Sequence, residues 1–239
     1  MKKYLMMGAA AVALTAVSAG DASAFGKGAY LGLHAGFSHN TAKLETKTTG
    51  TANKIKLNAV DHTITPTYDN KGTGAFVGNV FVGFDKVFKE SWLFDVRLFG
   101  SYDTANVKLG TFTSTVPATT EGKFSYRPQF GVGLGFYFGR MLNEKIAGYL
   151  GLAGEFNFAK LKFEAKVAGK SYSHTDNIQV FSLTPSLGIK GHINDKMSWL
   201  AEVGYKFGLN ASGVHKDLNM KLKTKPNALQ IKVGASYHF

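Results

Sequence analysis

Charged side chains of both signs alternate with small or apolar residues in several segments of this chain. Asp95 and Arg97 are two residues apart, and Glu202 and Lys206 are four residues apart. Residues at even spacing share one face of a β-strand, so each pair would point the same way. Buried carboxylates and cations persist only when they are paired and hydrogen-bonded. Such a set could build a structural ion-pair network or line a path for small ions.

Eight charged residues share this predicted face. From their distances to the nearest turns, we expect Lys190 and Glu202 at a similar depth on adjacent strands, and Glu155 close to Arg127. The predicted network consists of Asp95, Arg97, Arg127, Glu155, Lys190, Glu202, Lys206 and Lys232. We interpret it as a plug of paired charges, with a small-solute porin or a gated narrow channel as the functional alternative.

Histidine is the other residue type that could do chemistry here. His34, His192 and His238 share the parity of the charged residues, and the other four histidines lie in or beside long connections. No two histidines have the close spacing of a metal motif, and a catalytic dyad needs a nucleophile within hydrogen-bonding reach. We therefore expect no catalytic residue, no metal and no cofactor. A lipid A-modifying enzyme is a third, weaker alternative.

The elements that must position these side chains are strands. Apolar residues recur at every second position in eight segments, which is the period of a strand with one apolar face. In a water-soluble sandwich the apolar faces would form a shared core, whereas in a membrane barrel they face lipid. The eight segments are residues 29–37, 76–84, 92–102, 124–138, 150–158, 181–189, 199–207 and 229–239.

The connections between these segments favour the membrane barrel. "DKVFKE", "GRMLNEK" and "NDKM" are short, and they alternate with long connections near residues 40–72, 104–121, 160–177 and 210–226. Short turns at one end and long loops at the other are typical of outer-membrane barrels. Unpaired backbone groups in lipid cost several kcal/mol each, so the sheet must close. We predict an all-β, eight-stranded antiparallel transmembrane barrel with short periplasmic turns and long extracellular loops, although the first long connection could add two strands and make ten.

The amino-terminal residues predict export. Lys2 and Lys3 precede an apolar run of about thirteen residues, and Ala22-Ser23-Ala24 follows as a cleavage signal. We expect a signal peptide at residues 1–24, with a short membrane anchor as the alternative, and a barrel domain at residues 25–239. The chain contains no cysteine, so no disulfide framework is expected. The predicted location is the outer membrane.

The carboxy-terminal strand "KVGASYHF" resembles the strand read by the bacterial barrel-insertion machinery. Lys232, Gly234, Tyr237 and Phe239 carry this predicted assembly signal. Together with "GAYLGLHAGFS" and "GAFVG", the ending resembles small OmpA-like and opacity-type outer membrane proteins, including the alphaproteobacterial surface antigens of this class. The resemblance covers residues 25–239. It implies an outer-membrane barrel whose partners include the barrel-assembly machinery and periplasmic chaperones.

The formal net charge is +12, which suggests an anionic partner. Export argues against nucleic acid, so we expect outer membrane lipid and lipopolysaccharide as partners, and host polyanions as further candidates. The predicted polyanion contact in the last long loop consists of Lys216, Lys221, Lys223 and Lys225. We expect a monomeric surface protein that contributes to envelope integrity and to surface or host interaction.

Overall fold

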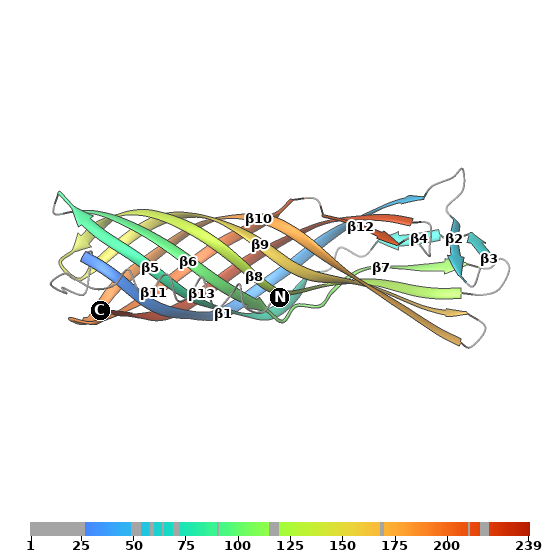
Figure 1. Ribbon diagram of the computed structural model, residues 1–239, viewed down its shortest axis with the longest axis horizontal. Coiled ribbons are helices and arrows are strands. Elements are labelled where there is room, and N and C mark those ends of the chain that lie inside the picture. The colour runs from blue at the N-terminus through green and yellow to red at the C-terminus, as the bar shows by residue number, and fades with distance from the viewer. Residues whose placement is uncertain are drawn as a thin grey trace, which may run out of the picture.

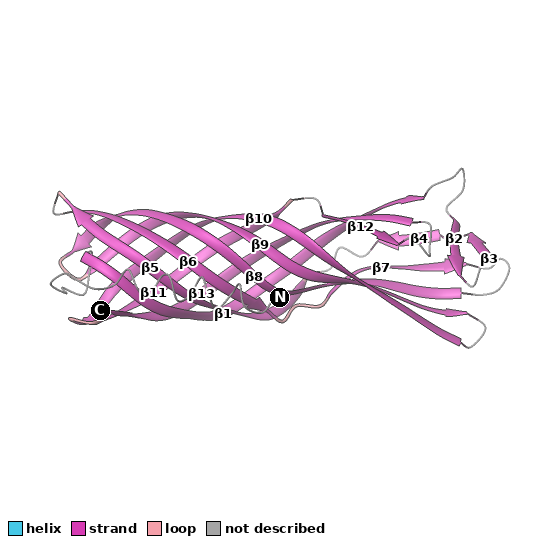
Figure 2. Cartoon of the chain, viewed as in Figure 1, coloured by secondary structure: helices cyan, strands magenta, loops and turns pink. Residues whose placement is uncertain are grey.

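The structure, a computed structural model, describes residues 27–48, 54–57, 60–63, 65–68, 72–89, 91–114, 120–167, 170–209, 211–215 and 220–239. The predicted signal peptide therefore lies outside the described residues. Every regular element in the described part of the chain is a β-strand (Figure 2). No helix in that part is long and apolar enough to cross a membrane.

The described residues form thirteen strands. In chain order they are β1 (Lys27–Thr48), β2 (Lys54–Leu57), β3 (Val60–Thr63), β4 (Thr65–Tyr68), β5 (Thr73–Phe88), β6 (Trp92–Asp103), β7 (Val107–Ser114), β8 (Thr120–Asn143), β9 (Ile146–Val167), β10 (Lys170–Asn194), β11 (Met197–Gly208), β12 (Ala211–His215) and β13 (Met220–His238).

Eight of these strands close into a ring. The hydrogen-bonded order is β1-β5-β6-β8-β9-β10-β11-β13, and β13 pairs with β1 along its whole length, from Tyr30↔His238 to Thr48↔Met220. Every neighbouring pair is antiparallel. The predicted eight-stranded barrel is confirmed, and the ten-stranded alternative is wrong. β2 and β3 form a separate two-stranded sheet, and β4 pairs with β7 outside the ring.

The long connections are mostly strands rather than loops. β9 and β10 form one hairpin that runs in register from Ile146↔Gly191 up to Val167↔Lys170. Figure 1 shows these hairpins projecting beyond one end of the ring, while the short turns and the carboxy terminus lie at the other end. We call the projecting part the extension, and it comprises β4, β7, β12 and residues 41–48, 120–127, 159–167, 170–180 and 220–228.

The ring carries a continuous outward band of apolar side chains, which we call the belt. Its members include Phe37, Leu150 and Ile231, with exposed fractions of 75%, 66% and 59%. Water-soluble proteins rarely expose apolar patches larger than a few hundred Å². The belt occupies about nine residues on β9, from Leu150 to Phe158, which matches the roughly 9–11 residues that a tilted strand needs to cross a bilayer. The ring is therefore built to span a membrane.

The extension has the opposite polarity. Its interior is an apolar cluster in which the rings of Phe112 and Phe163 stack at 5.4 Å and Phe124 packs against both. The remaining members are Ala42, Ala105, Val107, Leu109, Tyr126, Ala159, Leu161, Ala165, Ile178 and Val180. The sequence places Phe124 and Tyr126 on the lipid face, and this prediction is wrong, because both side chains point inward and are buried.

Candidate functional site

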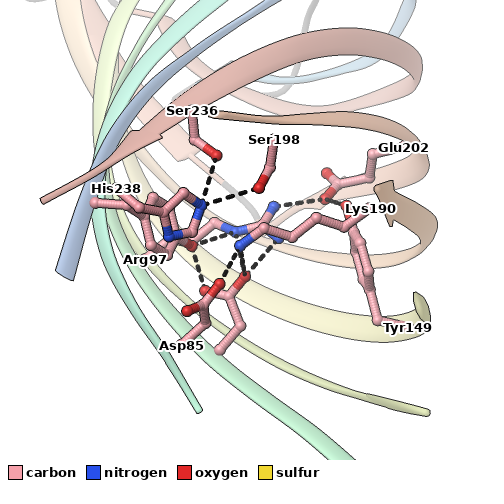
Figure 3. A network of polar contacts seen from close by, with 10 residues as sticks. Asp85, Arg97, Tyr149, Lys190, Ser198, Glu202, Ser236 and His238 are labelled. Carbon is pink, nitrogen blue, oxygen red and sulfur yellow. Dashed lines mark hydrogen bonds and ion pairs between the residues drawn. The ribbon is translucent and has the colours of Figure 1, made fainter. Parts of the chain in front are cut away.

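Arg97 lies at the centre of the charged network inside the ring (Figure 3). The fully buried guanidinium contacts Asp95 Oδ2 at 2.8 Å and Glu202 Oε2 at 3.4 Å. Its Nε also donates to Tyr30 Oη at 3.1 Å. The ring of Tyr137 lies under the guanidinium at 3.9 Å, a cation–π contact that is stronger where water is excluded. One cation on β6 thus connects side chains on β1, β8 and β11.

A second cation, Lys190, approaches the same cluster from β10. Its ammonium group forms an ion pair with Asp85 and lies 3.8 Å from Asp95. It also lies 4.1 Å from the centre of the Tyr30 ring, and the Tyr30 hydroxyl donates to Asp95. Each of these charges is completely or almost completely buried. The contacts cross the lumen rather than following adjacent strands.

Glu202 connects the group around Arg97 and Lys190, the lower charged group, to β13, the strand that closes the ring against β1. Its carboxylate forms an ion pair with Lys232 Nζ at 3.1 Å and accepts a hydrogen bond from Tyr149 Oη at 3.3 Å. It also contacts Arg97. Lys232 and Glu202 are also direct cross-strand partners on β13 and β11. Lys190 and Glu202 lie at a similar depth on adjacent strands, as expected, because Glu202 pairs with Gly188, two residues from Lys190. The Lys190 ammonium group turns toward β5 and β6.

A separate charged group lies nearer the extension. Lys206 Nζ is 2.7 Å from Glu155 Oε2 and donates to Asn157 Oδ1 at 2.8 Å. The amide of Asn157 donates to Ser182 Oγ at 2.7 Å. The carboxylate of Glu155 also accepts from Ser101. This group is half-buried around Lys206 and forms the upper level of the polar interior.

Side chains leave little free space in the lumen. One cavity of about 20 Å³ lies between the two charged groups, with Glu155, Glu202 and Lys232 in its lining. A second cavity of about 20 Å³ lies higher, beside Asp103. Each is large enough for about one water molecule. An eight-stranded ring has an interior just wide enough for side chains to fill, and paired charges fill this one.

Arg127 does not join the network, so the sequence prediction for this residue is wrong. β8 contains one extra residue at this point, because Pro128 pairs with Ala159 whereas Phe130 pairs with Phe158. A bulge of this kind reverses which residue numbers face inward on its two sides, from even numbers up to Pro128 to odd numbers from Gly131 on. Pro128 therefore faces inward, although its parity predicts the lipid side, and Arg127 is exposed on the outer surface.

Two members of the network have no counterpart in the sequence prediction. Asp85 falls in the stretch "DKVFKE", which the sequence analysis assigns to a turn, but β5 continues to Phe88 and carries Asp85 inward. Continued alternation after Phe81 is the signal that could have identified it. Tyr30 is missed because an aromatic residue on the polar face looks like packing. Its hydroxyl gives it a polar role.

Two of the three histidines predicted to face inward, His34 and His238, are buried, and His192 is half-buried. The His34 ring packs against Phe81 at 4.6 Å. His238 Nε2 lies 3.0 Å from Ser198 Oγ, and both residues are buried. The Ser198 hydroxyl and the His238 imidazole are thus within hydrogen-bonding distance, but both are buried and not accessible to a substrate. Among the described residues, no group of three or more His, Cys, Asp or Glu side chains is placed to hold a metal ion.

The closing strand divides the predicted assembly signal between two faces. Lys232 points into the lumen, and Gly234 lies against His34. Tyr237 and Phe239 are exposed on the outer surface, with ring centres 5.7 Å apart. Recognition of these four residues by an assembly machinery remains a prediction.

The predicted polyanion contact lies on a strand rather than in a loop. Lys225 is exposed and Lys223 is half-buried, both on β13 within the extension. Lys221 lies on the same strand, although its side chain is outside the description, and Lys216 lies outside the described residues. Lys225 directly faces Lys43 of β1.

Opposite charges are paired elsewhere on the outer surface of the extension. Glu164 on β9 lies 2.9 Å from Lys162 and 3.1 Å from Lys123 of β8. Hydrogen bonds from Lys162 and Lys123 lower the pKa of the Glu164 carboxyl below its ordinary value. These groups are exposed, so the ion pairs are screened and contribute little stability.

Comparison with known proteins yields structural likenesses only. No protein-family model matches the chain, and no curated protein sequence is detectably similar to it. Among solved structures, OprG of Pseudomonas aeruginosa aligns with a TM-score of 0.45 and 14% identity, over 92% of this chain and all of that one.

Two further structures align less well. Neisserial surface protein A has a TM-score of 0.40 at 12% identity, over 89% of this chain and all of that one. Ail, the attachment invasion locus protein of Yersinia pestis, has a TM-score of 0.34 at 17% identity, over 89% and 99% of the two chains. All three values are below 0.5, so no role is carried over from these proteins.

Proposed function

We propose that this protein is an outer-membrane surface protein, whose ring anchors it in the bilayer and whose extension projects from the cell. The single observation that supports this proposal most strongly is the outward belt of the ring. An antiparallel ring leaves no unpaired strand edge, which is the condition for a sheet to lie in lipid. The short turns then lie in the periplasm and the extension outside.

The interior of the ring supports a structural role rather than transport. Arg97, Lys190 and Glu202 are paired across the lumen and almost inaccessible to solvent. Above them, the apolar cluster around Phe112 and Phe163 fills the interior of the extension. A hydrated solute would have to break the buried ion pairs and then cross an apolar layer. These features favour envelope integrity and surface recognition over a porin.

The outer surface of the extension supports recognition of an anionic partner. Lys43 and Lys225 are exposed, and the two lysines face each other across β1 and β13. Like charges directly opposite each other destabilise a strand pair, and a sulfated or phosphorylated polymer would neutralise them. We therefore propose that host polyanions or the polysaccharide of lipopolysaccharide contact this side of the extension.

Chromatography of the purified protein in detergent on immobilised heparin tests this proposal. We expect retention at low salt and elution at lower salt for Lys223→Gln/Lys225→Gln, because fewer counterions are released. The matched control is Lys145→Gln/Lys196→Gln, which removes the same charge at the short-turn end. An equal shift for both variants, or no retention of the unmodified protein at low salt, would contradict the proposed contact.

A further inference from the structure

The bulge in β8 creates a second cationic feature on the outer surface, distinct from the lysines of β13. It turns Arg127 out of the ring at the position directly opposite Lys160 of β9. Both side chains lie on the outer face, where Arg127 is exposed and Lys160 is half-buried. Two cations that face each other across a strand pair repel, so this arrangement calls for an anion between them.

Further polar and charged side chains lie nearby: Lys108 adds positive charge, whereas Lys162 is already paired with Glu164. Ser125 is the cross-strand partner of both Lys108 of β7 and Lys162 of β9, so these two lysines lie on either side of it in the row above Arg127. Asn177 of β10 faces Lys160 in the same row as Arg127 and is exposed. The amide group of Asn177 can donate a hydrogen bond. Four neighbouring strands, β7 to β10, thus present donors to one area.

Elsewhere in the same hairpin, lysine charges are neutralised by a carboxylate. Glu164 lies opposite Lys123 and pairs with both Lys123 and Lys162. Among the described residues, no carboxylate forms an ion pair with Arg127 or Lys160. The upper row of the hairpin carries its own counter-ion and the lower row does not. The anion for the lower row must therefore come from outside the chain.

The position of the lower row identifies the source of that anion. Phe130 and Phe158 form the next outward pair, at the edge of the belt nearest the extension, and their rings stack at 4.6 Å. Aromatic girdles mark the level of the lipid headgroups. A two-residue step along a strand is about 7 Å, so Arg127 and Lys160 lie just outside the hydrocarbon. Phosphates of the outer-leaflet lipid occupy this level.

We propose that Arg127 and Lys160, flanked by Lys108, bind a phosphate of a phosphorylated glycolipid in the outer leaflet. Arginine can hold a phosphate through two parallel hydrogen bonds, and lysine adds a point charge. This site rests on the proposed placement of the ring in the outer membrane. It differs from the proposed polyanion contact, which lies on β1 and β13 farther from the belt, because it lies on β8 and β9 beside the belt and binds a lipid phosphate.

Native mass spectrometry of the detergent-solubilised protein with bis-phosphorylated lipid A provides the test. We expect Arg127→Gln/Lys160→Gln to weaken binding about tenfold or more, since hydrogen bonds to charged groups are the strong ones. The matched control is Lys145→Gln/Lys196→Gln, which removes two exposed lysines at the short-turn end, outside both proposed contacts. We expect the control to keep nearly full binding. Dephosphorylated lipid A should bind weakly to all three proteins.

Three results would overturn the site: unchanged binding by Arg127→Gln/Lys160→Gln, an equal loss in the control, or equal binding of dephosphorylated lipid A. Full competition by inorganic phosphate at the same concentration would indicate a free-anion site and also contradict the headgroup assignment. Insertion of each variant into liposomes, measured by its heat-modifiable migration on gels, is scored separately. Normal insertion of the unmodified protein without lipid A binding would reject the site while leaving the proposed membrane placement intact.

Discussion

The ring and the extension use the same strands with opposite polarity. On β9, Leu152 and Phe156 face outward in the ring and Glu155 faces inward, whereas in the extension Phe163 faces inward and Glu164 outward. The hydrogen-bonded ladder between β9 and β10 is continuous through both regions. Backbone pairing therefore does not set the polarity of a face. The solvent outside does, and the level at which the polarity reverses marks the membrane boundary.

The strands reverse polarity in two different ways. In β9 the apolar residues change parity, from Phe156 and Phe158 to Leu161 and Phe163. In β8 the apolar residues keep even numbers throughout, and the extra residue beside Pro128 changes the face instead. A change of sequence pattern and a bulge thus achieve the same result on neighbouring strands.

Breaking the ring interior should have the largest effect. Arg97→Met leaves Asp95 and Glu202 buried without their shared cation, and removing one partner of a buried ion pair destabilises a protein by about 3–5 kcal/mol. Denaturant unfolding in liposomes, followed by fluorescence of Trp92 and Trp199, measures this loss. A change below about 1 kcal/mol would contradict a tightly paired interior.

Breaking the extension interior should act locally. Phe163→Ala removes a ring that packs between Phe112 and Phe124, and such truncations cost about 3–5 kcal/mol when the site cannot collapse. Hydrogen exchange should show faster exchange in residues 120–127 and 159–167, with the ring protected as before. Loss of protection throughout the ring would show that the two regions do not unfold separately.

The same substitution, to arginine, can be placed on the outer surface of the ring and on the outer surface of the extension to compare their surroundings. Leu152→Arg puts a charge in the belt, where the cost is about 2–4 kcal/mol near the bilayer midplane. Ser173→Arg places the same side chain on the exposed outer face of the extension, where surface changes usually stay within about 0.5 kcal/mol. The unfolding free energy of both variants in liposomes tests this difference. Equal effects would mean that Leu152 does not face lipid.

Acidification should have the smallest effect. Because the pKa of Glu164 is lowered in the folded protein, its stabilising contribution is fully present above the ordinary carboxyl pKa and disappears as pH falls through the lowered value. Exposure keeps the contribution small. Hydrogen exchange near residues 121–125 and 162–166 should rise slightly at low pH. Glu164→Gln should remove this response, and a response that persists in the variant would assign it to another group.

The sequence predicts the ring well because alternation, turn lengths and closure in lipid constrain one another. The outward positions of Leu150, Leu152 and Ile231 follow directly from the period of two. The errors occur where that period is interrupted or continued unexpectedly. A single extra residue in β8 turns Arg127 outward. In β5 the alternation continues beyond the predicted end of the strand and places Asp85 inside the ring. Contacts across the lumen, such as Lys190 with Asp85, depend on closed-ring geometry that strand spacing does not provide.

The polarity of the extension was also present in the sequence as the change of parity between Phe158 and Leu161. This change of parity is hard to interpret alone, because alternation shows that the two faces of a strand differ without showing which face is exposed to water. A long connection with its own apolar face is the sign of a folded hairpin rather than a loop.

The reversal of polarity is tested most directly by labelling two outward positions. The chain has no cysteine, so Leu152→Cys and Ser173→Cys can each carry one fluorophore in liposomes made with brominated acyl chains. We predict strong quenching at position 152 by the brominated lipid and none at position 173, with the reverse order for aqueous iodide. Equal quenching of both positions by either agent would contradict a membrane boundary between ring and extension.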